Sequence, residues 1–325
     1  MLKILNHEIK RGEKWIADYQ VRGADGHTVF FPYYIIAGKH DGPVACITSG
    51  VHGTEYPGIG ANFQLYHDIS PAELTGTIIG VPICNQASFA DKIAFVNPLD
   101  RKNLNKIFPG KPNGTISEKL CSTLIHEIAA KADFHIDLHS GDNIEYLYPY
   151  TFCHMHTSNP KNTAASREMA QVYGLDFIVY TKSSDTAASD KGNFYATVSE
   201  LGIPSIQPEI GGVGLMQEET KMLHYTGVRN VLAYKGMLDQ AIKKNAKQRE
   251  LFRFYRLKSE CNGIYHRFVS PGQFVKKGDL LARITDYHAE ETYFEFFAEE
   301  NAVILWVMSS FATKIGENLM ALGVV

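Results

Sequence analysis

The sequence predicts an α/β domain with a mainly parallel sheet, followed by a smaller all-β domain. Up to about residue 250, short apolar runs alternate with segments of helical periodicity, which is the pattern of α/β proteins. From about Leu251 the chain instead contains short strand-like runs separated by Pro-Gly and Lys-Gly turns. A chain of 325 residues that is 45% hydrophobic can form one large and one small domain. We therefore expect domains at residues 1–250 and 251–325.

The strands and helices of the first domain can be placed in chain order. Residues 15–40 read as two strands joined by the turn "GADGH", which is a hairpin near the N-terminus. Further strands are expected at residues 43–50, 75–85, 133–142, 176–180 and 203–212. Helices are expected at residues 58–69, 115–132, 162–173, 193–202 and 217–245, the second of them opened by a Thr/Ser cap and Glu118. The Asn-, Pro- and Gly-rich residues 97–114 read as a long structured loop.

Composition indicates an unremarkable soluble surface and a reducing compartment. The chain has 32 basic and 35 acidic residues, so no charge excess favours nucleic acid or a membrane as partner. We expect no membrane span, and the charged start "MLKILNHEIKRGEKW" does not fit a signal peptide. The five cysteines form no CxxC pair, which favours free thiols. We therefore expect a cytoplasmic protein.

Polar residues follow three of the expected strands at the points where these strands end. The first is followed by His52 and Glu55, and the others end with His139 and Glu209. Because ligands of parallel α/β sheets gather beyond the carboxyl ends of the strands, these side chains are candidates for one site. Two imidazoles and a carboxylate are a common catalytic zinc set, and a further carboxylate suits a general base. The alternative is a set of hydrogen-bonded structural residues in strand-end turns.

A second histidine pair occurs in "FCHMHT", residues 152–157. The HxH spacing of His154 and His156 is typical of metal ligands. The segment reads as a loop without a carboxylate partner, however, so we expect these two histidines to be structural.

Four segments in this order resemble the succinylglutamate desuccinylase/aspartoacylase family, a branch of the zinc carboxypeptidase-like hydrolases. They are "SGVHGTEYPG", "NPLDRKNLNKIFPG", "IDLHSGD" and "PEIGG". The resemblance spans roughly residues 40–240 and implies a zinc-carboxypeptidase-like mixed sheet flanked by helices. It also implies a smaller C-terminal all-β, barrel-like domain, similar to the lipoyl-type barrel of bacterial members.

The resemblance also implies roles for the strand-end residues. His52, Glu55 and His139 would hold one Zn²⁺ per chain, and Glu209 would take a proton from the attacking water and give it to the leaving amine. Asp137 lies two residues before His139, so both point to the same face of the strand. It either orients a ligand histidine or is a buried strand-end aspartate.

The sequence departs from the family pattern at the residues expected to bind substrate. Where the family usually reads Asn-Leu-Asn-Arg, this chain has Lys106 after Asn105. Lysine is a point charge and cannot make the two-bonded contact of an arginine. Arg101 stands where a glycine is usual, and Lys92 is the basic residue nearest to the position of a second family arginine. We expect Asn105 and Lys106, with Arg101 or Lys92, to bind the polar end of the substrate.

The C-terminal domain lacks the modifiable lysine of a carrier domain. Residues 284–304, "ITDYHAEETYFEFFAEENAVI", contain no lysine that could carry a lipoyl or biotinyl group. A structural, lid or subunit-contact role is expected, and the aromatic "YFEFF" is suited to bury against a neighbour, including a second copy in a homo-oligomer.

The sequence therefore predicts a zinc-dependent amidohydrolase that removes the acyl group from a small N-acyl amino acid or related N-acyl amine. Two alternatives stay open. One is a metallocarboxypeptidase, which would share the zinc ligands and the glutamate but need a more open cleft. The other is a non-catalytic zinc-binding protein, which would not need Glu209 as a base.

Overall fold

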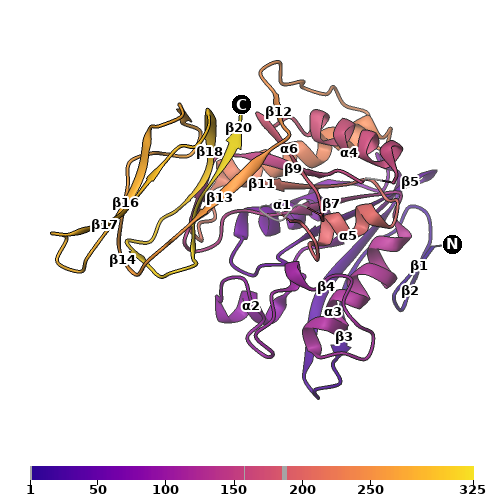
Figure 1. Ribbon diagram of the computed structural model, residues 1–325. Helices are drawn as coiled ribbons and strands as arrows, with labels where there is room; N and C mark the ends of the chain where they lie inside the picture. The colour runs from indigo at the N-terminus through magenta and orange to yellow at the C-terminus, as the bar shows by residue number, and fades with distance from the viewer. Residues whose placement is uncertain (1, 157, 185–188) are drawn as a thin grey trace.

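The computed structural model describes residues 2–156, 158–184 and 189–325, which form a large α/β body and a C-terminal β region (Figure 1). A nine-stranded sheet with the order β12-β10-β9-β11-β7-β5-β6-β4-β3 runs through the body. Its strands are β3 (Lys14–Arg22), β4 (Thr28–Ala37), β5 (His40–Ser49), β6 (Thr75–Val81), β7 (Phe134–Leu138), β9 (Tyr150–His154), β10 (Phe177–Thr181), β11 (Ser205–Glu209) and β12 (Arg249–Leu251). Five neighbouring pairs are parallel and three are antiparallel, which confirms the expected mixed sheet.

Helices cover both faces of this sheet. They are α1 (Tyr56–Asp68), α2 (Gln86–Asp91), α3 (Ile116–Thr123), α4 (Pro160–Tyr173), α5 (Phe194–Glu200) and α6 (Glu218–Tyr234), with short turns η1 (Leu104–Lys106), η2 (Leu124–Ile128) and η3 (Ala129–Lys131). Residues of α1, α4 and α6 share one core cluster, and residues of α3 and α5 share another. Alternate residues of β5 belong to the two clusters, because successive side chains of a strand point to opposite faces.

Three expectations about the body were wrong in detail. Residues 150–154 are strand β9, so residues 152–154 of the segment expected as a loop belong to a strand. All five residues of β9 are buried, so the strand lacks the alternation that marks a half-exposed one. The helix expected at 217–245 ends at Tyr234, because Gly236 takes a left-handed conformation (φ 72°). The helix expected at 115–132 begins with the predicted capping box of Thr115 and Glu118, but changes to η2 and η3 after α3.

The C-terminal β region is antiparallel and packs against the body through a shared hydrophobic cluster, and one short strand of the body also pairs with it. Its strands are β13 (Phe254–Lys258), β14 (Gly263–Arg267), β15 (Phe274–Val275), β16 (Leu280–Thr285), β17 (Thr292–Phe297), β18 (Ala302–Met308), β19 (Ala312–Thr313) and β20 (Asn318–Val324). β8 (Glu145–Leu147), which follows β7, pairs with β18 and so joins the sheet β13-β20-β18-β15. The segment after β7 therefore ties the end of the large sheet to the C-terminal region.

The N-terminal strands lie outside the large sheet. β1 (Leu2–Ile4) and β2 (His7–Ile9) form a separate two-stranded sheet. No helix among the described residues has the length and hydropathy to cross a bilayer. The division into domains at residues 1–250 and 251–325 stays a prediction. β12, residues 249–251, spans the expected boundary and belongs to the large sheet.

Candidate active site

The candidate site lies where three neighbouring strands end. β7 pairs in parallel with β5 on one side and β11 on the other, so residues that follow or end these strands meet at one edge of the sheet. His52 and Glu55 lie in the turn between β5 and α1, where Glu55 is the residue before the helix. His139 follows β7 directly and forms an isolated bridge with Glu209 at the end of β11. The structure thus brings together the three strand ends that the sequence singled out.

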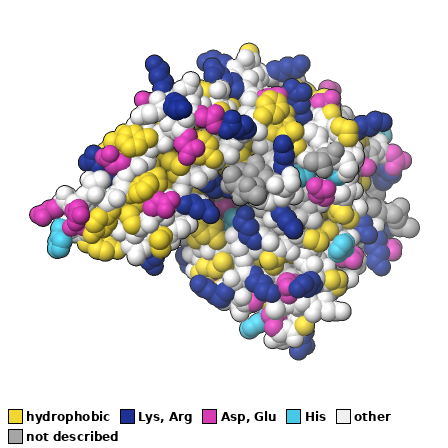
Figure 2. Space-filling model, in the orientation of Figure 1, with side chains coloured by type: hydrophobic (Ala, Val, Ile, Leu, Met, Phe, Trp, Pro, Cys, Tyr) yellow, Lys and Arg dark blue, Asp and Glu magenta, His cyan; other side chains and the backbone are white. Residues whose placement is uncertain are grey.

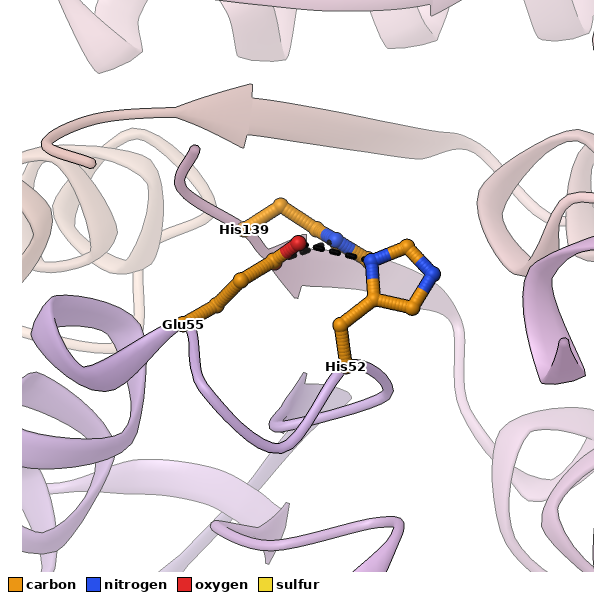
Figure 3. Close-up of side chains that lie close together, drawn as sticks. All are labelled: His52, Glu55 and His139. Atoms are coloured by element: carbon orange, nitrogen blue, oxygen red, sulfur yellow. Dashed lines mark hydrogen bonds and ion pairs between the residues drawn. The ribbon is translucent and has the colours of Figure 1, made fainter. Parts of the chain in front are cut away.

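The Glu55 carboxylate contacts both imidazoles (Figure 3). One carboxylate oxygen, Oε1, is 2.6 Å from His52 Nδ1, and the other, Oε2, is 2.7 Å from His139 Nδ1. The backbone N–H of Ser140 also donates to Oε2 at 3.1 Å. All three side chains are buried, and one ligand atom from each lies within 4.8 Å of the others. A single ion could therefore contact all three.

The other nitrogen of each histidine has an oxygen partner. His52 Nε2 is 3.1 Å from Asn103 Oδ1, and His139 Nε2 is 3.1 Å from Asp137 Oδ2. With Nε2–H donated outward, each ring has Nδ1 as its free ligand atom for a metal. This second contact is the kind that fixes the tautomer and orientation of metal-binding histidines.

A hydrogen-bond chain extends from Asp137 into the sheet. The Thr48 hydroxyl donates to Asp137 Oδ1 at 2.6 Å, so its oxygen is left to accept from His135 Nε2, 2.8 Å away. His135 Nδ1 then accepts from the Ser205 hydroxyl at 2.8 Å. These groups are buried, and each hydroxyl has a definite direction in the chain. Asp137 is therefore held by β5 and β7 together.

Burial and charge act against each other on the ionisable groups of the site. Burial favours the neutral form of Glu55, but His139 and His52 beside it lower the pKa of this carboxyl to about 2. Burial likewise opposes protonation of His139, yet the carboxylates of Glu55 and Asp137 raise its pKa well above the usual value. The imidazoles and the carboxylate thus stabilise one another, and a divalent cation between them could supply the same positive charge beside Glu55. Two imidazoles and one carboxylate are a donor set that suits Zn²⁺.

Glu209 is buried beside this cluster. Its carboxylate does not belong to the group of three side chains whose ligand atoms lie close enough to hold one ion. Gln207 Nε2 donates to its Oε1 at 2.8 Å. Burial raises the pKa of Glu209 well above its usual value, and the nearby negative charge of Glu55 acts in the same direction. A carboxyl group whose pKa is raised is a stronger proton acceptor than an ordinary glutamate.

The cluster opens into a cavity of about 620 Å³. Its acidic lining residues are Glu55, Glu145 and Glu209, and its apolar and aromatic ones include Phe95, Leu147, Tyr150, Phe152 and Trp306. Three cationic side chains also line it: Lys106, Arg256 and Lys258. Trp306 belongs to β18, and the last two cations belong to β13, so the C-terminal region forms part of the wall.

The residues expected to bind substrate are separated by the structure. Asn105 and Lys106 line the cavity, and Asn105 Oδ1 accepts from the backbone N–H of Phe194 at 2.8 Å, which leaves the amide nitrogen as the group it can offer a ligand. Lys92 and Arg101 are exposed and are not among the lining residues. The role of these two in substrate binding stays a prediction.

Sequence reasoning missed Asn103 and Arg256. Asn103 stands two residues before Asn105, in the segment already assigned to the substrate, but nothing local shows that its side chain reaches His52. Arg256 has no signal in the sequence, because its place in the cavity depends on how β13 lies against the body.

The second histidine pair has carboxylate partners after all. His154, at the end of β9, lies with Nδ1 2.6 Å from Asp190 Oδ2 and Nε2 2.8 Å from Glu200 Oε1. His156 Nε2 is 3.4 Å from Glu200 Oε2. The expectation of no carboxylate partner was wrong, since both partners come from segments more than 30 residues further along the chain. Among the described residues, the only group of three or more side chains whose ligand atoms lie close enough for one ion is His52, Glu55 and His139. Thr157, the last residue of "FCHMHT", lies outside the described residues.

Comparison with known proteins gives a consistent result. The family model described as the succinylglutamate desuccinylase/aspartoacylase catalytic domain matches residues 41–235. The chain is 26% identical over 263 residues to N-alpha-acetyl-L-2,4-diaminobutyric acid deacetylase of Halomonas elongata, covering 79% of this chain and 75% of that protein.

Two solved structures are similar along almost the whole chain. A succinylglutamate desuccinylase from Silicibacter sp. TM1040 has a TM-score of 0.86 and 26% identity, with 98% of this chain and 97% of that one covered. The ectoine utilization protein EutE (DoeB) of Ruegeria pomeroyi, in a product-bound structure, has a TM-score of 0.87 and 25% identity, with 98% of both chains covered. The similarity therefore includes the C-terminal β region as well as the body.

Proposed function

The chain belongs to the succinylglutamate desuccinylase/aspartoacylase family, and from this premise we propose that it is a zinc-dependent amidohydrolase that cleaves small N-acyl amino acids. The observation that carries the proposal is the buried His52–Glu55–His139 cluster with a further carboxyl group, Glu209, in the same cavity. The Halomonas elongata relative, a deacetylase of an N-acetylated diamino acid, supports the reaction class.

Zn²⁺ is the cofactor that these residues fit best. His52 Nδ1, His139 Nδ1 and a Glu55 carboxylate oxygen would hold it, and the fourth position would be open to water or substrate. When bound, zinc supplies Lewis acidity for the amide carbonyl and lowers the pKa of a water molecule. Asn103 and Asp137 would keep the two histidines oriented toward the ion.

Glu209 is proposed to move the proton. Its carboxylate accepts a proton from the attacking water and then donates it to the leaving amine nitrogen, which turns a poor leaving group into a free amine. Burial supports this role, since it raises the pKa of Glu209 and so favours proton uptake. The Gln207 amide, which donates to Oε1 at 2.8 Å, keeps the carboxyl group in place during both transfers.

The cavity favours small substrates over peptides. Residues of β13 and β18 line it together with the strand ends of the body, so the C-terminal region narrows the space in front of the cluster. This arrangement is less suited to a metallocarboxypeptidase, which must admit an extended chain. A non-catalytic zinc site is disfavoured because such sites are usually closed by four protein ligands.

The test is the variant Glu209→Gln, studied with measured zinc content on a panel of N-acetyl, N-succinyl and N-formyl amino and diamino acids. We expect the wild type to release amine from one class of substrate and a chelator to abolish the activity. Glu209→Gln should bind zinc as the wild type does but lose about 10²–10⁴-fold in kcat, the usual contribution of a general base.

The matched control is Glu145→Gln, which neutralises another carboxyl group of the same cavity. Glu145 is the acceptor for the backbone N–H of Asp142 and has no proposed role in proton transfer. An equal loss in both variants, or full activity of Glu209→Gln, would refute the assignment of the base.

A further inference from the structure

Tyr150 is a buried tyrosine of the cavity that has no part in the proposed proton transfer. It is the first residue of β9 and is only 2% exposed, yet it lines the cavity. C-terminal strands form part of the cavity wall, and Figure 2 shows Lys and Arg side chains gathered where these strands meet the body. The hydroxyl of a buried tyrosine usually has a hydrogen-bond partner, as that of Tyr34 has in Asn62. No hydrogen bond between described residues uses the Tyr150 hydroxyl, so this group can meet a ligand in the cavity.

The register of the sheet places Tyr150 directly beside Glu209. The two residues are Cα partners in the antiparallel pair of β9 and β11, and the next pair on the same face is Phe152 and Gln207. Side chains directly opposite each other in such a pair project from one face, with Cβ atoms about 4.5–5.5 Å apart. All four residues line the cavity, and the rings of Tyr150 and Phe152 meet edge to face with centroids 5.0 Å apart. The phenol is therefore held beside the carboxyl group that is proposed to move the proton.

Strand order decides which part of an amide the phenol would meet. β11 lies between β7 and β9, so Glu209 has His139 on one side and Tyr150 on the other. In the proposed reaction the carbonyl oxygen faces the His–Glu–His cluster and the nitrogen faces Glu209. Tyr150 lies on the far side of Glu209 from that cluster, and so it is next to the nitrogen rather than the oxygen.

We propose that Tyr150 is a further catalytic residue whose hydroxyl oxygen accepts a hydrogen bond from the N–H of the scissile amide. The proposal rests on the proposed amidohydrolase function and adds a contact to the leaving nitrogen. With the N–H held by Tyr150, the nitrogen turns its lone pair toward Glu209 as the acyl carbon becomes tetrahedral. The water oxygen bonds to the acyl carbon, one water proton passes through Glu209 to the nitrogen, and the C–N bond breaks. Tyr150 keeps its own proton throughout.

The surroundings of Tyr150 keep its hydroxyl neutral. Burial raises the pKa of Tyr150 well above its usual value, and the negative charge of Glu209 acts in the same direction, while Arg256 opposes the shift. A neutral phenol does not repel the Glu209 carboxylate, and its oxygen can accept a hydrogen bond from the nitrogen. The nitrogen becomes positively charged as it takes the proton, so this hydrogen bond strengthens during the reaction and should act mainly on kcat.

Kinetics of Tyr150→Phe on the best amide substrate test its role in the reaction. Loss of a hydrogen bond to a nitrogen that becomes charged should lower kcat per bound zinc about 10- to 100-fold and raise KM less. Zinc content and melting temperature should stay as in the wild type. The matched control is Tyr148→Phe, which removes a hydroxyl that donates to Asp176 outside the cavity and should keep full kcat.

Calorimetry tests the contact itself. The zinc-loaded Glu209→Gln enzyme is titrated with each N-acyl amino acid and with its ester, the 2-acyloxy acid in which oxygen replaces the N–H. Adding Tyr150→Phe should weaken the binding of at least one amide about 2- to 10-fold, the range for a neutral hydrogen bond, and leave the binding of its ester unchanged.

The inference is overturned if Tyr150→Phe keeps the kcat of the wild type, if it changes amide and ester binding equally, or if Tyr148→Phe loses kcat to the same extent. Failure of the proposed function looks different. A wild type that hydrolyses no amide of the panel refutes the amidohydrolase, and calorimetry still decides the contact to the N–H. Hydrolysis by the wild type with full kcat in Tyr150→Phe leaves the amidohydrolase and refutes the catalytic tyrosine.

Discussion

The Asp137→Asn variant tests whether the histidine partners matter for metal binding. The Asp137 carboxylate is fully buried and accepts from two donors, His139 Nε2 at 3.1 Å and the Thr48 hydroxyl at 2.6 Å. An asparagine offers one oxygen in place of two, and its NH₂ group must then face one of these donors. We expect one lost hydrogen bond, and with it a less firmly oriented His139 ring.

The expected effect is on zinc affinity. Loss of a hydrogen-bond partner of a metal-binding histidine typically weakens metal affinity about 10–100-fold, or about 1.4–2.7 kcal/mol. Competition with a chromophoric chelator measures the zinc dissociation constant, and the melting temperature of the metal-free protein measures the cost to folding. The loss of zinc affinity should come from the contact between Asp137 Oδ2 and His139, because Thr48 contacts the other oxygen, Oδ1, and does not touch the ligand ring.

Thr48→Val is the matched control. It removes the hydroxyl that donates to Asp137 Oδ1 but leaves the contact between Asp137 Oδ2 and His139. We expect zinc affinity to change less than about threefold in this variant, because the bond that orients the ligand ring persists. Zinc affinity of Asp137→Asn within twofold of the wild type would refute the reasoning, and so would an equal loss in Thr48→Val.

Two further predictions concern stability and the position of the turn that contains His52 and Glu55. Burial lowers the pKa of His135 to about 4, so the folded protein binds fewer protons here than the unfolded chain, and stability is lost as the pH falls below 6.5. Between pH 6.5 and 4.5 this residue should cost about 2 kcal/mol of unfolding free energy, a loss that His135→Gln should lack in metal-free denaturant titrations; equal pH slopes would contradict it. Gly53 lies between His52 and Glu55, and a Cβ there would meet the backbone nitrogen of Phe89 at 2.1 Å. Gly53→Ala should therefore destabilise the protein by about 1–3 kcal/mol and lower its zinc affinity, and a variant with unchanged values for both would disprove the close approach.

The predictions made from sequence succeeded where local pattern carries the information. The alternation of strands and helices, the capped start of α3 and the three strand ends were all expected, because periodicity, caps and polar residues after apolar runs are local features, whereas the mixed sheet was expected from the family resemblance. β9 was missed because it has no such local pattern. A strand that is buried on both faces has no alternation, and its last residue, His154, resembles a loop residue when its partners are not known.

The sequence by itself determined which residue types stand at the ends of neighbouring strands, and hence the chemistry of the candidate zinc site. His52, Glu55 and His139 meet because parallel strands of one sheet end at the same edge, and this rule needs no knowledge of side-chain packing.

Only the tertiary structure decided which side chains surround that site. Asn103 approaches His52 across 51 residues of sequence, and Arg256 enters the cavity because β13 belongs to a sheet that also includes β8 of the body. Such contacts follow from the way the C-terminal β region packs on the sheet edge. The strand pairing between β8 and β18 and the hydrophobic cluster shared by the two parts hold that arrangement, and no residue near Arg256 in the chain indicates it.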